Sequence, residues 1–238
     1  MTPAELTGQA RSHLAAVDGG ELLLHREAVS AFLAMREGAA RAGIELTLAS
    51  AFRDFERQRA IWNAKYRGEQ PVLDAAGVAI DVHGLEPAAR VAAILAWSAL
   101  PGGSRHHWGT DLDVFDRAAV AAGYRLQLVS AEYAADGVFG RLSDWLDRNM
   151  RRFGFYRPYA TAQGGVQPEP WHLSFAPVAE PARQRLSVDL LAAALRGREV
   201  LGEAAILAAL PAIHARYLQA VDLPPRMRSR WARRASVA

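Results

Sequence analysis

Apolar residues recur three and four positions apart along much of the chain, the spacing of one face of an α-helix. Leu24, Ala28, Phe32 and Met35 follow this pattern, and Gly43 ends it. The same criterion, with Pro87 in the first turn of one helix, predicts several helices. They cover residues 4–17, 25–41, 54–66, 87–99, 141–153, 187–196 and 202–220.

Strict alternation of apolar and polar residues marks the predicted strands. Ile44, Leu46 and Leu48 alternate with Glu45 and Thr47, which predicts a strand at 44–48. Further short strands are predicted at 110–115, 155–159 and 171–175, and residues 67–86 read as a long connection. Strands and helices of uneven length without a regular βαβ alternation favour an α+β fold.

Composition narrows the class of protein. With 51% hydrophobic and 22% charged residues in 238 positions, the chain predicts one globular domain with or without an appendage. Cysteine is absent, so any metal must be held by His, Asp or Glu. No glycine-rich loop that would cradle a phosphate is present. The net charge of the chain is +3, and five arginines follow Pro224. Without these five, the rest of the chain would carry a net charge of −2, so the positive charge belongs to the C-terminal residues. We interpret residues 224–238 as a solvated basic tail and expect no nucleic-acid partner.

The N-terminal residues lack a basic segment followed by an apolar stretch, so we expect no signal peptide. No apolar run approaches the roughly 18 residues that span a bilayer. The sequence therefore predicts a cytoplasmic protein without a membrane span, and its oligomeric state is left open.

Two short segments gather most of the candidate chemistry. Ser104–Asp113 and Glu169–His172 together contain three histidines and three carboxylates flanked by aromatic residues. A catalytic Zn²⁺ site needs about three protein ligands and keeps a fourth position for water. A bend at Gly109 would bring His106 and Asp113 together, with His172 supplied from a second strand. Glu169 would then reach the zinc-bound water without being a ligand.

These segments resemble the motifs of a known family. Ser104–Asp113 resembles the Ser-x-His-x-x-Gly-x-Ala-x-Asp motif of zinc D-Ala-D-Ala peptidases, and Glu169–His172 resembles their Glu-x-Trp-His motif. Ser50–Gln58 is similar to that family's Ser-Gly-Tyr-Arg-Ser…Gln segment. The closest likeness, over residues 44–177, is to the VanY-type carboxypeptidases, in a group that also contains VanX-type dipeptidases and phage endolysins.

The resemblance implies a role for each matched residue. The zinc ligands would be His106, Asp113 and His172, and Glu169 would be the catalytic base and acid. Arg53 would hold the substrate or stabilise charge on the attacked carbonyl oxygen, because its fixed fork of donors suits an oxyanion or a carboxylate.

The same resemblance predicts the substrate side of the site and the fold around it. Ser104 would bind the substrate's terminus, Gln58 would support Arg53 or the substrate, and Trp171 would also bind the substrate. The implied fold is a small antiparallel sheet with flanking helices and zinc on the face of the sheet.

One position departs from the family pattern. Asp111 stands where the motif has alanine. It could orient the ligand His106 through a hydrogen bond, compete for the metal, or face solvent; we favour a supporting or solvent-facing role over ligation. His107 occupies an unspecified motif position, and we expect it not to bind metal.

The motifs and the helical pattern predict how the chain is divided. We expect a zinc peptidase domain at 1–180, with its catalytic core at 44–177, a helical C-terminal appendage at 181–223 and the basic tail. The leading hypothesis is a zinc carboxypeptidase that removes C-terminal D-alanine from small peptidoglycan peptides or muropeptides. A cytoplasmic enzyme would fit recycled tetrapeptides, hence L,D- rather than D,D-carboxypeptidase activity.

Three alternatives stay open at this stage. The first is a D,D-carboxypeptidase or dipeptidase that acts on D-Ala-D-Ala termini. The second is an endopeptidase that cuts between L-Ala and D-Glu. The third is a catalytically silent zinc-containing module that binds cell-wall peptides.

Overall fold

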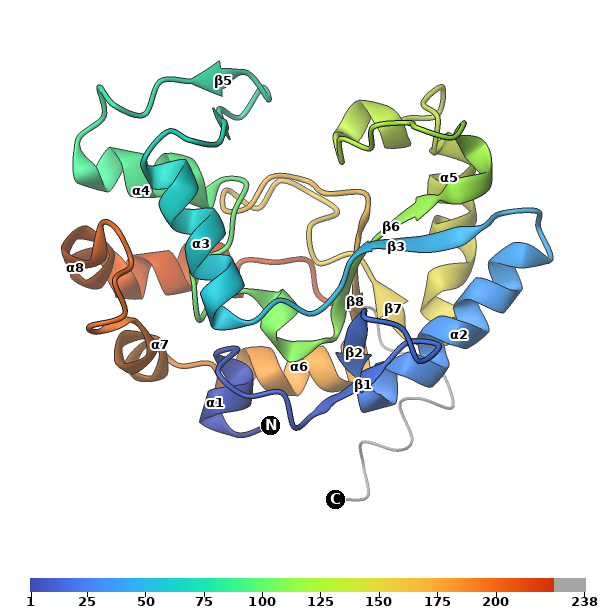
Figure 1. The fold of residues 1–238 in the computed structure, drawn as a ribbon, viewed down its shortest axis with the longest axis horizontal. Helices are drawn as coiled ribbons and strands as arrows, with labels where there is room; N and C mark the ends of the chain where they lie inside the picture. Colours follow the sequence, from blue (N-terminus) through green and yellow to red (C-terminus); the bar gives the residue numbers. More distant parts are fainter. Residues whose placement is uncertain (225–238) are drawn as a thin grey trace.

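The computed structural model describes residues 1–224 (Figure 1). Of the predicted basic tail, 224–238, only Pro224 lies within the described part. The helices are α1 (Pro3–Leu6), α2 (Arg26–Ala40), α3 (Phe55–Tyr66), α4 (Pro87–Leu95), α5 (Gly140–Asn149), α6 (Ala176–Arg185), α7 (Val188–Leu195) and α8 (Glu203–Ile213). The strands are β1 (Leu14–Ala16), β2 (Leu23–His25), β3 (Leu46–Ser50), β4 (Val72–Leu73), β5 (Ala79–Ile80), β6 (Asp111–Asp116), β7 (Phe155–Tyr156) and β8 (His172–Phe175). Shorter 3₁₀ turns are η1 (Arg105–Trp108), η2 (Arg117–Ala119), η3 (Ser130–Tyr133) and η4 (Met150–Phe153), and the π-helix η5 (His214–Gln219) follows α8.

The central sheet has the strand order β3-β6-β8-β7, and each neighbouring pair is antiparallel. Two small antiparallel pairs, β1–β2 and β4–β5, lie outside it. The register places Asp113 of β6 opposite His172 of β8 on one side and Ser50 of β3 on the other. The α+β class with a small antiparallel sheet and flanking helices is thus confirmed.

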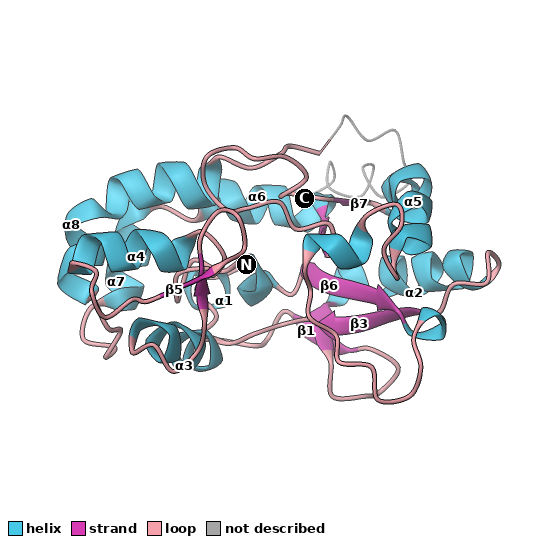
Figure 2. Cartoon of the chain, turned by 90° about the horizontal axis from the view of Figure 1, so that it is seen from above, coloured by secondary structure: helices cyan, strands magenta, loops and turns pink. Residues whose placement is uncertain are grey.

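Alternation along β6 and β8 separates an apolar face from a polar face of the sheet. Leu112, Val114 and Leu173 are fully buried and pack with α2 and α5 in one hydrophobic cluster. Because successive strand residues point to opposite faces, Asp111, Asp113, His172 and Ser174 share the other face. Figure 2 shows α2 and α5 on the same side of the molecule as the sheet. The apolar face therefore anchors the strands, and the polar face is available for chemistry.

The helices at the other side of the molecule form a second hydrophobic cluster (Figure 2). Phe55 and Trp62 of α3 pack there with residues of α4, α6, α7 and α8. The predicted appendage, 181–223, thus shares a core with α3 and α4. The domain boundaries themselves stay a prediction. None of the helices within residues 1–224 combines the length and the apolar character that a bilayer-spanning segment requires.

The predicted N-terminal helix over 4–17 is wrong. Helix α1 ends at Leu6, and Leu14–Ala16 form the strand β1 instead. Gly8 has a φ of 75°, and a Cβ there would lie 2.4 Å from Nδ1 of His107. The chain must therefore turn at Gly8 in a conformation that favours glycine, which stops the helix.

Helix α6 and the strands β4 and β5 also escaped the sequence analysis. Helix α6 contains Pro181 in its interior and has a proline in its first turn, and a proline inside a helix weakens the helical signal of the sequence. The connection 67–86 contains the two-residue strands β4 and β5, which are too short to show alternation. The helix predicted over 202–220 is observed as α8 followed by the π-helical turn at 214–219.

Candidate metal centre

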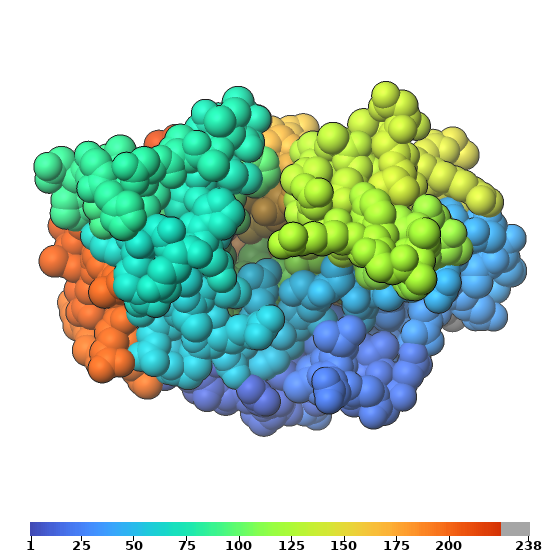
Figure 3. Space-filling model, turned by 45° about the horizontal axis from the view of Figure 1, so that its top comes forward, coloured from blue at the N-terminus to red at the C-terminus, as the bar shows by residue number. Residues whose placement is uncertain are grey.

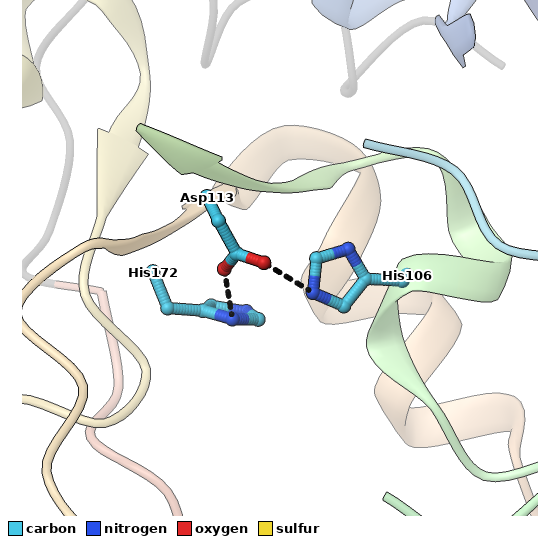
Figure 4. A group of neighbouring side chains, drawn as sticks. All are labelled: His106, Asp113 and His172. Atoms are coloured by element: carbon cyan, nitrogen blue, oxygen red, sulfur yellow. Dashed lines mark ion pairs between the residues drawn. The ribbon is translucent and has the colours of Figure 1, made fainter. Parts of the chain in front are cut away.

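The polar face of the sheet brings the three predicted ligands together (Figure 4). One ligand atom from each of His106, Asp113 and His172 lies within 4.8 Å of the others, and all three residues are buried. Asp113 Oδ2 is 3.5 Å from His106 Nε2, and Asp113 Oδ1 is 3.2 Å from His172 Nδ1. Ligands about 2.0–2.1 Å from one tetrahedral ion lie about 3.3 Å apart, close to the two distances from the Asp113 carboxylate.

Hydrogen bonds on the far side of each ring decide which nitrogen faces the centre. His106 Nδ1 is 2.8 Å from the carbonyl oxygen of Ala51, so it carries the proton and Nε2 presents a lone pair. His172 Nε2 donates to Asp111 Oδ1 over 2.9 Å, so Nδ1 presents its lone pair. Asp113 Oδ1 is buried and finds no hydrogen-bond donor among residues 1–224. Three acceptors converge on one point, an arrangement that a bound cation satisfies.

Electrostatics agree with a cation site. Burial lowers the pKa of His106 to about 3, helped by the charge of Arg53, so its imidazole is neutral and able to ligate. Burial alone would raise the pKa of Asp113, but His106, His172 and Arg53 outweigh it and lower the pKa to about 2. Burial alone would lower the pKa of His172, yet the carboxylates of Asp111, Asp113 and Glu169 raise it well above its ordinary value. Without metal, a proton is therefore drawn to His172.

Glu169 lies where the sequence analysis expected a base. Its Oε2 is 3.3 Å from His172 Nδ1, and its side chain is 14% exposed. The backbone turn from Glu169 to His172 is closed by a hydrogen bond from the His172 N–H to the Glu169 carbonyl, 3.1 Å. Glu169 lines the cleft together with the three ligands, so its carboxylate faces the space that a substrate would occupy.

Arg53 follows β3 and reaches the same centre. Its Nη2 is 3.9 Å from Asp113 Oδ2, and its Nη1 donates to Gln58 Oε1 over 3.1 Å. Gln58 is buried and donates in turn to the carbonyl of Ala99, so it braces Arg53 from behind. His107 is not among the three converging residues; its Nδ1 donates to the Arg53 carbonyl over 2.6 Å and holds that loop.

Asp111 supports His172, whereas the sequence analysis offered His106 as the residue it would orient. Its carboxylate is fully buried and accepts from His172, from Arg105 Nε at 2.7 Å and from the hydroxyls of Thr110 and Ser174. Four donors around one carboxylate leave it no free oxygen for a metal. The charge of Arg105 and the hydrogen bonds hold the pKa of Asp111 low although burial alone would raise it.

An open cleft leads to the centre. It encloses about 1270 Å³, including space open to solvent, and Figure 3 shows a hollow between two raised walls. Leu73 and Trp97 line it from one segment, and Gln127 and Leu128 from another. Ser104 lies in the cleft with a buried hydroxyl that has no partner among residues 1–224. Trp171 lines the cleft but is only 5% exposed and packs mainly in the sheet cluster.

Two cleft residues were missed by the sequence analysis. Tyr159 packs edge-on against His172, with ring centroids 5.0 Å apart, and Lys65 of α3 also faces the cleft. Tyr159 lies outside both motifs and carries no local signal. Lys65 is the chain's single lysine, and its place on a helix face after the Ser50–Gln58 segment was the signal available.

A His₂Asp donor set with an adjacent carboxylate, on the face of an antiparallel sheet at the bottom of a cleft, defines a metallopeptidase. The family model for VanY, D-alanyl-D-alanine carboxypeptidase, matches residues 21–178. The chain belongs to this family, whose members are metallocarboxypeptidases that act on peptidoglycan peptides.

Relatives and solved structures agree with this placement. An uncharacterized protein of Haemophilus influenzae is 39% identical over 117 residues, which are 48% of this chain and 89% of that protein. A D-alanyl-D-alanine carboxypeptidase of Enterococcus faecalis is 29% identical over 154 residues, 62% of this chain and 46% of that protein.

Two solved structures share the fold. VanYB in complex with D-alanine-D-alanine has a TM-score of 0.51 at 23% identity, over 80% of this chain and 92% of that one. The LdcB LD-carboxypeptidase has a TM-score of 0.50 at 23% identity, over 75% of this chain and 74% of that one.

Proposed function

We propose that this protein is a zinc-dependent carboxypeptidase that removes a C-terminal D-alanine from peptidoglycan-derived peptides. The observation that carries the proposal is the convergence of three acceptor atoms, from His106, Asp113 and His172, beside the free carboxylate of Glu169. A module that only binds peptides has no use for such a carboxylate next to the metal. The donor set of two nitrogens and one carboxylate oxygen suits zinc.

The residues divide the reaction among themselves. Zinc held by the three ligands would supply the Lewis acidity that activates water near neutral pH. Glu169 takes the proton of the attacking water and passes it to the leaving amine. Arg53, braced by Gln58, stabilises the negative charge that develops on the carbonyl oxygen. The unpaired hydroxyl of Ser104 donates to the substrate's terminus.

We further propose that the peptide bond cleaved is the L,D bond of a tetrapeptide. The fold shared with the LdcB LD-carboxypeptidase supports this assignment, and cleavage of a D,D bond is the alternative. Both a D-Ala-D-Ala-binding VanYB and an LD-carboxypeptidase share the fold, so the fold accommodates either substrate.

Mass spectrometry of muropeptides digested by the zinc-loaded protein tests the proposal. Release of D-alanine from the tetrapeptide is expected. Release from the pentapeptide alone would replace the L,D assignment with a D,D assignment. Fragments cut inside the peptide, with no free D-alanine, would overturn the carboxypeptidase proposal.

Removing the metal is expected to abolish activity reversibly. A chelator should reduce D-alanine release to background, and added Zn²⁺ should restore it, because the Lewis acidity that activates water leaves with the ion. Metal analysis of the His106→Ala variant should show loss of the ion. Undiminished D-alanine release from metal-free protein would rule out the assigned mechanism.

Zinc affinity is expected to fall as the pH is lowered. The neighbouring carboxylates raise the pKa of His172 in the metal-free protein, so a proton competes with the ion for His172 Nδ1. Titration of Zn²⁺ against a competing indicator between pH 5 and pH 8 measures this. An affinity that does not change with pH would show that His172 is not a ligand.

A further inference from the structure

Helix α3 presents two cations to the catalytic cleft. Arg57, Ile61 and Lys65 are spaced four residues apart, so they share one helix face, and all three line the cleft. The acidic residues of the cleft lining are Asp113 and Glu169, which belong to the metal centre. This wall of the cleft is therefore positive, and its charge is not used by the reaction steps assigned above.

Lys65 is the more constrained of the two cations. Its side chain is half-buried, and Nζ donates to Ser98 Oγ over 2.6 Å. No carboxylate forms an ion pair with it within residues 1–224, and an ammonium has three protons to donate. Burial lowers the pKa of Lys65, whereas the charge of Glu169 raises it. A partly desolvated charge without a counter-ion is costly, so a ligand anion would be bound favourably here.

The neighbouring groups are also donors. Ser98 accepts from Lys65 and so keeps its own hydroxyl proton for a ligand, and the Ser104 hydroxyl in the same cleft is unpaired. The Lys65 ammonium beside the Ser98 hydroxyl, with the Ser104 hydroxyl in the same cleft, offers donors that match the acceptor oxygens of a carboxylate.

The position relative to Glu169 identifies which carboxylate. Glu169 delivers the proton to the leaving amine, so a cation close to Glu169 in the cleft is also close to the residue that leaves. Lys65 interacts electrostatically with Glu169 and lies on the Arg53 side of the cleft. In a carboxypeptidase the leaving residue is the last one, and its α-carboxylate is one carbon from the leaving amine.

We propose that Lys65, with the hydroxyls of Ser98 and Ser104, binds the terminal α-carboxylate of the peptide and so restricts the enzyme to cleavage of the last residue. This rests on the proposed function and deepens it, because it explains exopeptidase rather than endopeptidase action. The substrate class is peptides that end in a free carboxylate.

The test compares one peptide in two forms, ending in D-alanine or in D-alaninamide, with the zinc-loaded enzyme. The wild type is expected to prefer the free acid by at least ~10-fold in kcat/KM, since a charged hydrogen bond is lost with the amide. Lys65→Met should lower kcat/KM for the free acid by ~10- to 100-fold, mainly through KM, and leave the amide rate unchanged. Lys65→Arg should keep part of the preference.

Arg57→Met is the matched control, because it removes the same charge from the same face two helical turns earlier. This variant should keep the ratio of kcat/KM for the free acid to that for the amide within about 3-fold of wild type, which is the size of effect expected for a neutral surface substitution. Equal hydrolysis of acid and amide by the wild type would overturn the proposal without any variant, as would an equal fall of both rates in Lys65→Met. If the wild type removed the last residue from neither peptide, the proposed function itself would have failed.

Discussion

Replacing Glu169 with glutamine is expected to lower kcat by about 10²- to 10⁴-fold, the usual contribution of a general acid–base group. The amide has the shape of the carboxylate but cannot take a proton from water. Glu169 Oε2 lies 3.3 Å from His172 Nδ1, so glutamine fits without moving the ligand. Because glutamine leaves the three ligands in place, the zinc content should remain that of the wild type.

Steady-state release of D-alanine together with metal analysis makes this measurement. Glu199→Gln is a suitable control, because that side chain is 85% exposed and lies on another surface. Activity retained in Glu169→Gln would contradict the mechanism. A parallel loss of zinc and activity would instead make Glu169 a ligand.

The sheet that carries the metal centre was predictable because alternation is a local signal. Asp111, Leu112, Asp113 and Val114 alternate in the sequence, and the same alternation divides β6 between its two faces. The convergence of His106, Asp113 and His172 followed from two motifs and a bend at Gly109. Gly109 adopts a φ of 65° there, and a Cβ would lie 2.6 Å from the His25 N–H nitrogen.

The parts that could not be predicted depend on contacts between distant segments. Helix α1 stops where Gly8 meets His107, almost a hundred residues later in the sequence. Arg105 pairs with Asp111 in the next strand, while Tyr156 and Ser174, which also accept from Arg105, come from β7 and β8. Local patterns hold no information on such pairs. The role of Asp111 at His172, rather than at His106, was for this reason visible only in the structure.

Replacing Asp111 with asparagine is expected to lower the free energy of unfolding by about 3–5 kcal/mol. Asp111 is 0% exposed and Arg105 is 4% exposed, so the variant leaves a buried guanidinium without its counter-ion. The comparison is Asp144→Asn, which breaks the exposed pair between Asp144 and Arg148 in α5 and should cost under about 0.5 kcal/mol. Urea denaturation of the metal-free proteins at pH 7 measures both.

The contribution of the Asp111–Arg105 pair to the free energy of unfolding depends on pH. The pKa of Asp111 is lowered in the folded protein, so its stabilisation is fully present above the unfolded value of about 3.9 and is lost as the pH falls toward the folded pKa. The gap in stability between wild type and Asp111→Asn should therefore persist at neutral pH and close only in strong acid. If the difference in stability disappeared near pH 7, the group whose titration controls it would be a histidine and not the Asp111 carboxylate.

A double variant separates stability from metal binding. Arg105→Met with Asp111→Leu replaces the buried pair by apolar side chains, which is often neutral or stabilising, so most of the lost unfolding free energy should return. The Nε2–H of His172 then has no carboxylate to which it can donate a hydrogen bond. The imidazole ring is therefore free to change its tautomer and its orientation. Zinc affinity should thus stay about 10- to 100-fold weaker than in the wild type although the fold is restored. If zinc affinity recovered together with stability, Asp111 would serve the fold alone and not the orientation of His172.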